Sequence, residues 1–138
     1  MRTEVDTNVL SLFWSRGHPL ASRISAELAH VQADGALVVS APVFVELSAF
    51  PIATPERVRA ALAEMNVEID FYLGEDVWQL SATTFAAYAI RRRRSGGGVP
   101  KRLLPDFVIA AHAMLNADRL MTRDAKRYRQ DFPGLRLI

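Results

Sequence analysis

The chain has 138 residues, no cysteine and a formal net charge of +2, and half of its residues are hydrophobic. This composition is typical of one globular domain, and it excludes a disordered chain, a disulfide framework and thiolate metal sites. No apolar run approaches the roughly 18 residues of a membrane span, and acids interrupt residues 1–10, where a secretory signal needs an apolar core. We therefore expect a soluble, cytoplasmic protein.

Charge is distributed unevenly along the chain. Residues 1–90 contain five Lys or Arg and eleven Asp or Glu, a net charge of −6, whereas residues 91–138 contain twelve and four, a net charge of +8. This asymmetry suits a polyanion that is attracted toward a cation-loaded carboxylate pocket. It is equally compatible with a solvated surface of uneven charge, and the sequence leaves both interpretations open.

The first half of the chain predicts strands that alternate with helices, because runs with β-propensity are separated by apolar residues at helical spacing. In chain order we expect a strand over residues 3–6, a helix with Asn8 as its N-cap, a helix over about 19–31, a strand over 36–39, a helix opened by Pro42, a helix opened by Pro55 and a strand over 67–71.

The second half predicts a helix from Glu75 to about Ile90, a helix restarting at Pro105, a strand over 120–122 and a possible fifth strand over 135–138. Between the two helices, the segment 91–98 combines four arginines with three successive glycines, which predicts a mobile basic loop. The alternation favours a three-layer α/β/α fold with a central, mostly parallel sheet of four to five strands, in a single domain over residues 1–138.

Four acids occupy comparable places in this scheme. Asp6 ends the first strand, Asp124 follows the strand that ends at Thr122, Asp106 lies in the first turn of a helix, and Glu46 lies within the helix after the second strand. Because the carboxyl ends of parallel strands and the following helix starts gather along one edge of a sheet, we expect the four carboxylates to meet there.

Carboxylates that are brought together repel one another and take up protons unless a cation offsets their charge. Oxygen-only ligands favour Mg²⁺, with Mn²⁺ possible, and the spacing of His18, His30 and His112 matches no zinc motif. A bound divalent ion activates water and polarises a phosphoryl oxygen, so phosphodiester hydrolysis is the reaction that this constellation predicts.

Each acid could also have a purely structural role. Asp6 could belong to a strand-to-helix turn, Asp106 could be a favourable charge at a helix N-terminus, and Asp124 could be a cap. Glu46 lies in the apolar run 43–47, where a carboxylate near the buried face is costly unless paired, although it could face solvent.

Four segments resemble PIN-domain ribonucleases, in order and at typical separations, over nearly the whole chain. They are Asp6-Thr7-Asn8-Val9-Leu10, the context of Glu46, Pro105-Asp106-Phe107-Val108-Ile109-Ala110-Ala111 and Thr122-Arg123-Asp124. The short length is most similar to the VapC toxins of bacterial toxin–antitoxin pairs. The resemblance implies a PIN-like fold, RNA cleavage, a homodimer and inhibition by a small VapB-like antitoxin whose C-terminal segment covers the groove.

The same resemblance implies roles for individual residues. Asp6, Glu46, Asp106 and Asp124 would form the catalytic and metal-binding acidic site, with Asp6 and Asp106 as direct magnesium ligands. Asn8, which would hold the first loop in shape, and Thr122, an auxiliary polar group beside Asp124, would belong to the substrate-binding set.

Two residues beside this pattern need separate explanations. The first strand of such proteins is usually apolar, whereas Glu4 lies on the same strand face as Asp6, so we expect either a strand near the sheet edge or a place for Glu4 in the acidic rim. His112 has no metal-ligand partner in the sequence, which favours a packing or polar-network role over catalysis.

Basic and aromatic residues add a substrate-binding prediction. Arg91, Arg92, Arg93 and Arg94, with Lys101 and Arg102, would bind RNA phosphates without reading sequence, or would form a solvated loop. A further set of aromatic residues is more typical of core than of base stacking: Phe13, Trp14 and Phe44.

The resulting hypothesis is a Mg²⁺-dependent endoribonuclease, the toxin of a VapBC-type pair, with metal-activated water as nucleophile and no covalent intermediate. The alternative is a non-catalytic RNA- or protein-binding domain with a PIN-like fold. A receiver-like phosphoacceptor domain fits poorly, because such domains carry adjacent acids after the first strand and this chain has Asp6-Thr7.

Overall fold

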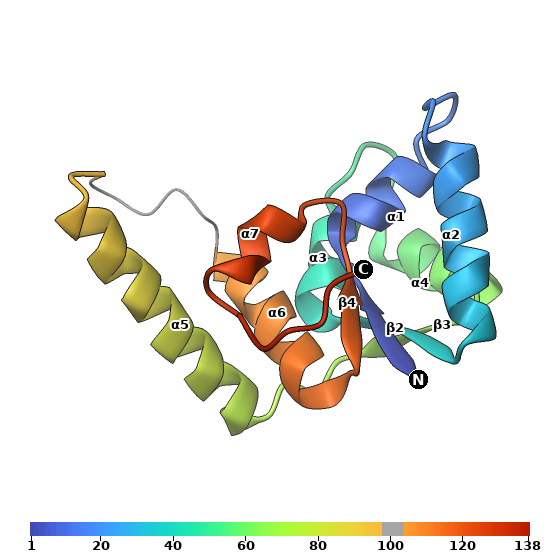
Figure 1. Ribbon diagram of the computed structural model, residues 1–138. Helices are drawn as coiled ribbons and strands as arrows, with labels where there is room; N and C mark the ends of the chain where they lie inside the picture. Colours follow the sequence, from blue (N-terminus) through green and yellow to red (C-terminus); the bar gives the residue numbers. More distant parts are fainter. Residues whose placement is uncertain (98–103) are drawn as a thin grey trace.

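A four-stranded parallel sheet with the order β3-β2-β1-β4 forms the centre of the fold (Figure 1). The computed structural model describes residues 1–97 and 104–138. The strands are β1 (Arg2–Val5), β2 (Ala36–Ser40), β3 (Val67–Asp70) and β4 (Arg119–Met121). β1 and β2 are therefore the interior strands, and the carboxyl ends of all four point the same way.

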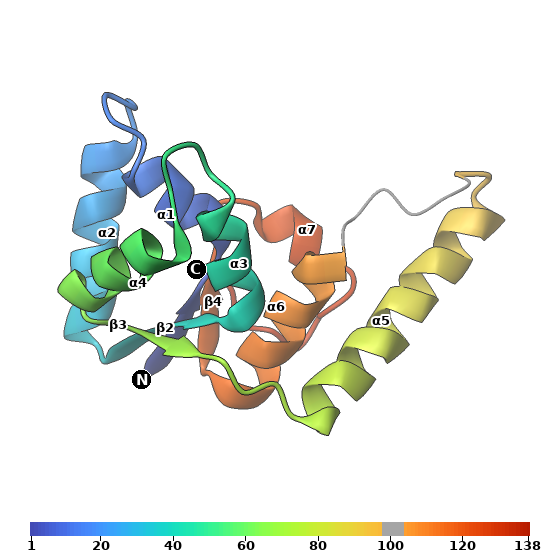
Figure 2. The same cartoon turned by 180° about the vertical axis from the view of Figure 1, so that it is seen from behind.

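Helices cover both faces of the sheet, so the predicted three-layer α/β/α architecture is confirmed. They are α1 (Thr7–Phe13), α2 (Ala21–Ala33), α3 (Ala41–Ser48), α4 (Pro55–Glu64), α5 (Glu75–Arg94), α6 (Leu104–Asn116) and α7 (Ala125–Arg129). α1, α2 and α4 lie on one side, α6 and α7 lie on the other with α5 packed outside α6, and α3 contacts both α4 and α6 (Figures 1 and 2). None of the helices in the described part of the chain has the length and apolar character needed to cross a membrane.

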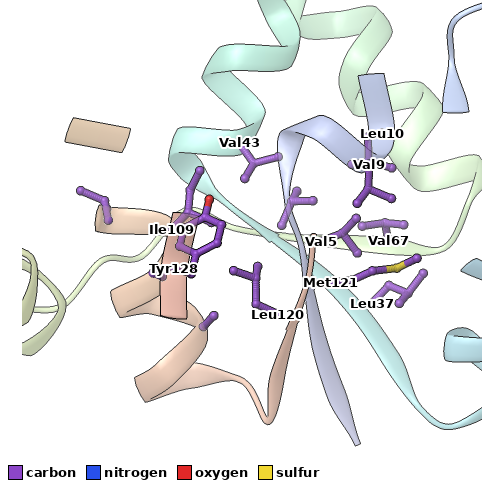
Figure 3. Close-up of a cluster of buried hydrophobic side chains, with 14 of the residues drawn as sticks. Val5, Val9, Leu10, Leu37, Val43, Val67, Ile109, Leu120, Met121 and Tyr128 are labelled. Carbon is purple, nitrogen blue, oxygen red and sulfur yellow. The ribbon is translucent and has the colours of Figure 1, made fainter. Parts of the chain in front are cut away.

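The core is divided by the sheet, because successive strand side chains point to opposite faces. In β4, Leu120 lies toward Ile109 of α6 and Tyr128 of α7, whereas Met121 lies with Val5 on the other side (Figure 3). All five side chains are buried. Phe13, Trp14 and Phe44 pack against this core while partly exposed, as their spacing predicted.

The four arginines at 91–94 form the last turn of α5, so the prediction of a mobile basic loop from residue 91 is wrong. Arginine is a good helix former, and cations are favoured at a helix C-terminus, so the helix continues through the run. It ends at Ser95, followed by Gly96 with φ +73°, a conformation that glycine adopts at little cost. Lys101, Arg102 and the end of the expected loop lie outside the described residues.

Two other predicted boundaries change. The expected fifth strand over residues 135–138 is reduced to a single parallel bridge between Leu120 and Leu137. No helix was predicted where α7 lies, a helix of five residues with Tyr128 as its buried side chain. A segment this short has too few apolar positions to display a helical period.

Both predictions made for Glu4 are wrong. β1 is an interior strand, and Glu4 is fully buried rather than placed at a sheet edge or in the acidic rim. Its carboxylate contacts Nδ1 of the equally buried His112 of α6, whose Nε2 lies 3.0 Å from Oδ2 of Asp70 at the end of β3. The polar-network role predicted for His112 is therefore confirmed, and the network links three elements of the core.

Electrostatics explain why this buried network is tolerated. Burial raises the pKa of Glu4. Hydrogen bonding to His112 and Ser40, and the charge of His112, act to lower this pKa but do not cancel the rise. Burial alone would lower the pKa of His112, but Glu4 and Asp70 together raise it. A protonated His112 thus supplies the charge that offsets a carboxylate inside the core.

Candidate active site

Asp6 is the hub of a hydrogen-bonded cluster at the carboxyl end of β1. It is 3% exposed and caps α1, with Oδ1 accepting a hydrogen bond from the backbone N of Thr7 at 2.8 Å. Oδ2 accepts from Thr122 Oγ1 at 2.8 Å, Tyr128 OH at 2.9 Å and Asn8 Nδ2 at 3.1 Å. The N-cap predicted at Asn8 is therefore displaced by two residues, and Asn8 instead lies in the first turn, where its amide joins Asp6 to Thr122.

Glu46 reaches this cluster from α3. Its Oε1 accepts a hydrogen bond from Oγ1 of Thr7 at 2.8 Å, so the residue after Asp6 connects the two acids. Burial raises the pKa of Glu46, the Thr7 hydrogen bond opposes this rise, and the negative charges of Asp6 and Asp106 raise the pKa further. Glu46 is therefore half-buried, and it lies close enough to both aspartates for their negative charges to raise its pKa.

Asp106 and Asp124 join the same region through Arg127 of α7. Nη1 of Arg127 donates to Oδ1 of Asp106 at 3.2 Å, and Nε lies 3.2 Å from Oδ2 of Asp124. Asp106 is in the first turn of α6 and is 8% exposed. Asp124 precedes α7, and its side chain makes no capping hydrogen bond, so a helix cap does not account for it.

The charge balance of the cluster is unfavourable for carboxylates. Burial raises the pKa of Asp6 despite hydrogen bonds from Thr122, Tyr128 and Thr7 and attraction from Arg127. Burial opposes the charge of Arg127, yet the surrounding acids, Asp106 foremost, raise its pKa. Within the described residues, the four acids and Arg127 together carry more negative than positive charge, which a bound cation would offset.

The donor chemistry fits a divalent cation. The acidic side chains offer only oxygen ligands, which suits Mg²⁺ or Mn²⁺ better than a softer metal. Over residues 1–97 and 104–138, however, no three acidic or histidine side chains are arranged as a ready metal site. The guanidinium of Arg127 instead bridges two of the four carboxylates. Asp106 and Asp124 therefore share an internal cation, and Asp6 and Glu46 lie close enough for its charge to act on their pKa values.

The arginines predicted to bind substrate lie on a different element. Arg91 forms an ion pair with Asp131, and Arg92 donates to the backbone oxygen of Gly97 at 2.7 Å. Arg93 and Arg94 are exposed at the end of α5. Two of the four arginines thus have partners within the chain and two face solvent.

Sequence reasoning missed three residues of the cluster. Thr7 was treated only as the neighbour of Asp6, although its hydroxyl orients Glu46. Arg127 and Tyr128 lie three and four residues after Asp124, so a helix predicted after Asp124 would have turned them toward the same site. Without that short helix there was no signal for either.

Comparison with known proteins agrees with this geometry. The family model of the PIN domain matches residues 4–133. The chain belongs to the PIN-domain family. The resemblance stated from the four sequence segments is thereby confirmed, and PIN domains are generally nucleases.

Solved structures extend the likeness over the whole fold. VapBC-1 from nontypeable Haemophilus influenzae is 26% identical with a TM-score of 0.62, covering 100% of this chain and 97% of that one. VapBC2 from Rickettsia felis bound to a promoter DNA fragment is 20% identical with a TM-score of 0.64, covering 100% and 98%. FitAcB from Neisseria gonorrhoeae is 17% identical with a TM-score of 0.61, covering 99% and 96%. No curated protein matches the chain at a significant level.

Proposed function

We propose that this PIN domain is a divalent-metal-dependent endoribonuclease that uses Mg²⁺, or Mn²⁺ in its place, and serves as the toxin of a VapBC-type pair. The observation that carries the proposal is the convergence of Asp6, Glu46, Asp106 and Asp124 from four separate segments on one cluster. All four side chains offer oxygen ligands, and the raised carboxyl pKa values of Asp6 and Glu46 show that added positive charge would be favourable there.

In this proposal some residues hold the metal ion and others orient its ligands. Asp6 and Asp106 would hold the ion, with Glu46 and Asp124 completing the acidic pocket, and the bound ion would supply an activated water for attack on phosphorus. Thr122, Tyr128 and Asn8 fix the orientation of the Asp6 carboxylate, and Thr7 fixes that of Glu46. Such partners hold ligands in place before substrate arrives, which is how an outer shell supports a metal site.

The test compares RNA cleavage by the wild-type protein, Asp6→Asn and Asp124→Asn, with Mg²⁺ and with EDTA. Both variants should fall to the level of the EDTA reaction, while Glu64→Gln, an exposed acid at the end of α4, should cleave like wild type. Circular dichroism of each variant verifies folding. Cleavage that persists in EDTA, or that survives in both site variants, would contradict the proposal. RNA binding without cleavage by the wild type would favour a non-catalytic domain.

Exposed arginines at the end of α5 are proposed to attract the RNA backbone. Because Arg93 and Arg94 face solvent, they can neutralise phosphates without breaking an internal pair. Replacing both with serine should reduce the slope of log affinity against log salt by about 1 to 2, since each lost phosphate contact removes about 0.7 to 0.9. The assay is RNA binding to the Asp6→Asn variant over a salt titration, and an unchanged slope would remove this role.

An antitoxin is the proposed protein partner, supported by the VapBC and FitA–FitB complexes that the fold resembles. An apolar cavity of about 480 Å³ lies between α1, α4 and the loop before α4, and its lining includes Trp14, Phe50 and Ile52. Ile52 is 89% exposed, so it is available to a partner. Co-purification with the product of the adjacent reading frame should be lost in Ile52→Asp but kept in Ile90→Asp on α5. Equal retention of both would place the partner elsewhere.

A homodimer belongs to the same proposal. β3 is an edge strand, and the segment that follows it exposes large aromatic side chains, with Phe71 50%, Tyr72 80% and Trp78 49% exposed. Light scattering after size-exclusion chromatography should give twice the chain mass, and Tyr72→Glu combined with Trp78→Glu should give the monomer mass. A wild-type monomer at micromolar concentration would contradict the dimer.

A further inference from the structure

Arg127 lies among the four acids of the candidate site. Its guanidinium bridges Asp106, from the start of α6, and Asp124, from the end of β4, with both contacts at 3.2 Å. The same positive charge also opposes the rise in the pKa values of Asp6 and Glu46 that burial causes. One side chain therefore compensates all four acids of the site.

The ion pair of Arg127 with Asp106 differs from an ordinary surface salt bridge. The Asp106 side chain is only 11% exposed and comes from another helix, whereas Asp124, three residues before Arg127, is 46% exposed. The Arg127 side chain is 39% exposed, so one side of it faces the acids and the other faces solvent. It can therefore leave the cluster by a side-chain rotation, without unfolding α7.

We propose that Arg127 is an internal competitor for the divalent cation. The inference rests on the proposed function, because it assigns to Arg127 the place that the cation would take. In the metal-free protein the guanidinium offsets part of the negative charge and bridges Asp106 and Asp124. Binding of the cation then requires that these ion pairs break, which weakens the apparent affinity for metal.

The prediction is a gain of metal affinity when the competitor is removed. In Arg127→Gln, the dissociation constant for Mn²⁺ measured by isothermal titration calorimetry should fall by about five- to tenfold, the range expected from losing two partly exposed ion pairs. Arg127→Lys keeps the charge but cannot bridge two carboxylates with a planar fork, so its affinity should lie between those of wild type and Arg127→Gln.

Arg129→Gln is the matched control. It removes the same charge from the same helix, but Arg129 is exposed and has no ion pair within the described part of the chain, so its Mn²⁺ affinity should equal that of wild type. An equal gain in both variants would show a general effect of net charge and would overturn the proposal. Unchanged or weaker Mn²⁺ binding by both Arg127→Gln and Arg127→Lys would overturn it as well.

Thermal unfolding gives a readout that is independent of cleavage. Without metal, Arg127→Gln should melt below wild type, because the acids lose their counter-ion, and saturating Mn²⁺ should raise its Tm by more than it raises that of wild type. If wild type cleaves RNA with Mn²⁺ while Arg127→Gln gains no affinity, this inference fails and the nuclease proposal stands. If neither protein binds Mn²⁺, both the competition and the metal dependence are refuted.

Discussion

Replacing His112 with leucine should destabilise the protein increasingly as the pH rises. His112 and Glu4 are both fully buried and in contact, so leucine leaves Glu4 without a counter-charge in the core. Removing one partner of a buried ion pair typically costs about 3 to 5 kcal/mol. Protonation of the buried Glu4 carboxyl reduces this cost. Because protonation is less favourable at higher pH, the destabilisation depends on pH.

The size of the pH effect follows from the protonation of Glu4. In the unfolded chain its pKa is near the ordinary value of 4.5. Keeping the carboxyl neutral in the fold costs about 1.4 kcal/mol for each pH unit above that value, which is about 1.4 kcal/mol at about pH 5.5 and about 4 kcal/mol at about pH 7.5. The unfolding free energy of His112→Leu should therefore fall by about 2.7 kcal/mol over this range, a steeper decline than that of the wild type, in which Glu4 keeps His112 as its counter-charge.

The wild-type network has its own pH dependence. The pKa of His112 is raised in the fold, so its stabilisation is complete below 6.5 and is lost as the pH rises through the higher folded value. Glu4, also raised, acts in the same direction from 4.5 upward. Asp70 acts oppositely. Burial raises its pKa, but hydrogen bonds from His112 and the Tyr72 backbone, with the positive charges of His112 and Arg2, together lower it, and its contribution is lost as the pH falls through that lowered value. Wild-type stability should therefore decline on the alkaline side.

The assay is urea denaturation at about pH 5.5 and about pH 7.5, followed by fluorescence of Trp14 and Trp78. His30→Leu, on the exposed face of α2, controls for loss of a histidine. Glu4→Met combined with His112→Leu removes both buried charges at similar volume, so its unfolding free energy should change less between these pH values than that of His112→Leu alone. A destabilisation by His112→Leu that is the same at both pH values would refute the reasoning.

Three further predictions concern the site and the sheet. Thr7→Val removes the hydroxyl that orients Glu46 and should lower the RNA cleavage rate by about 10- to 100-fold, measured beside Thr7→Ser, which keeps the hydroxyl and should retain most of the rate. Tyr128→Phe removes the hydrogen bond to Asp6 and should lower the free energy of unfolding by about 1 kcal/mol in urea denaturation; no change would show that water replaces the hydroxyl. Gly35→Ala should prevent soluble expression or lower Tm sharply, because its Cβ would lie 1.9 Å from the backbone oxygen of the first residue, and a normal Tm would contradict this packing.

Most elements of the fold were predictable because long apolar periods and turn residues mark them. The strands at 36–40 and 67–70 and the helix opened by Pro55 were placed within one or two residues. The prediction for residues 91–94 was wrong because composition was given more weight than helix propensity. A charged run followed by glycines suggested a loop, although arginine itself favours helix. The helix continues to Arg94 and ends immediately before Gly96, so the first glycine, rather than the start of the charged run, marks the boundary.

The acidic cluster was predictable for a different reason. The end of a parallel strand has a known place in the fold, so Asp6 and Asp124 could be assigned to one edge from order alone. The pairing of Glu4 with His112 could not be predicted from the sequence. The two residues are 108 positions apart, and their contact depends on how α6 lies across β1. The same limit applies to Arg127, whose partner Asp106 is 21 residues away on another helix.

The short helix α7 links these observations. A five-residue helix is not stable alone, so tertiary contacts must hold it. Tyr128 supplies the anchor, with its ring in the core and its hydroxyl on Asp6, while Arg127, one residue earlier, extends to Asp106 and Asp124. Because neighbouring residues of one turn contact three of the four acids, any shift of α7 changes the position of Asp6, Asp106 and Asp124 relative to one another. The spacing of the carboxylates is therefore set by how α7 is anchored as well as by the sheet edge from which two of them project.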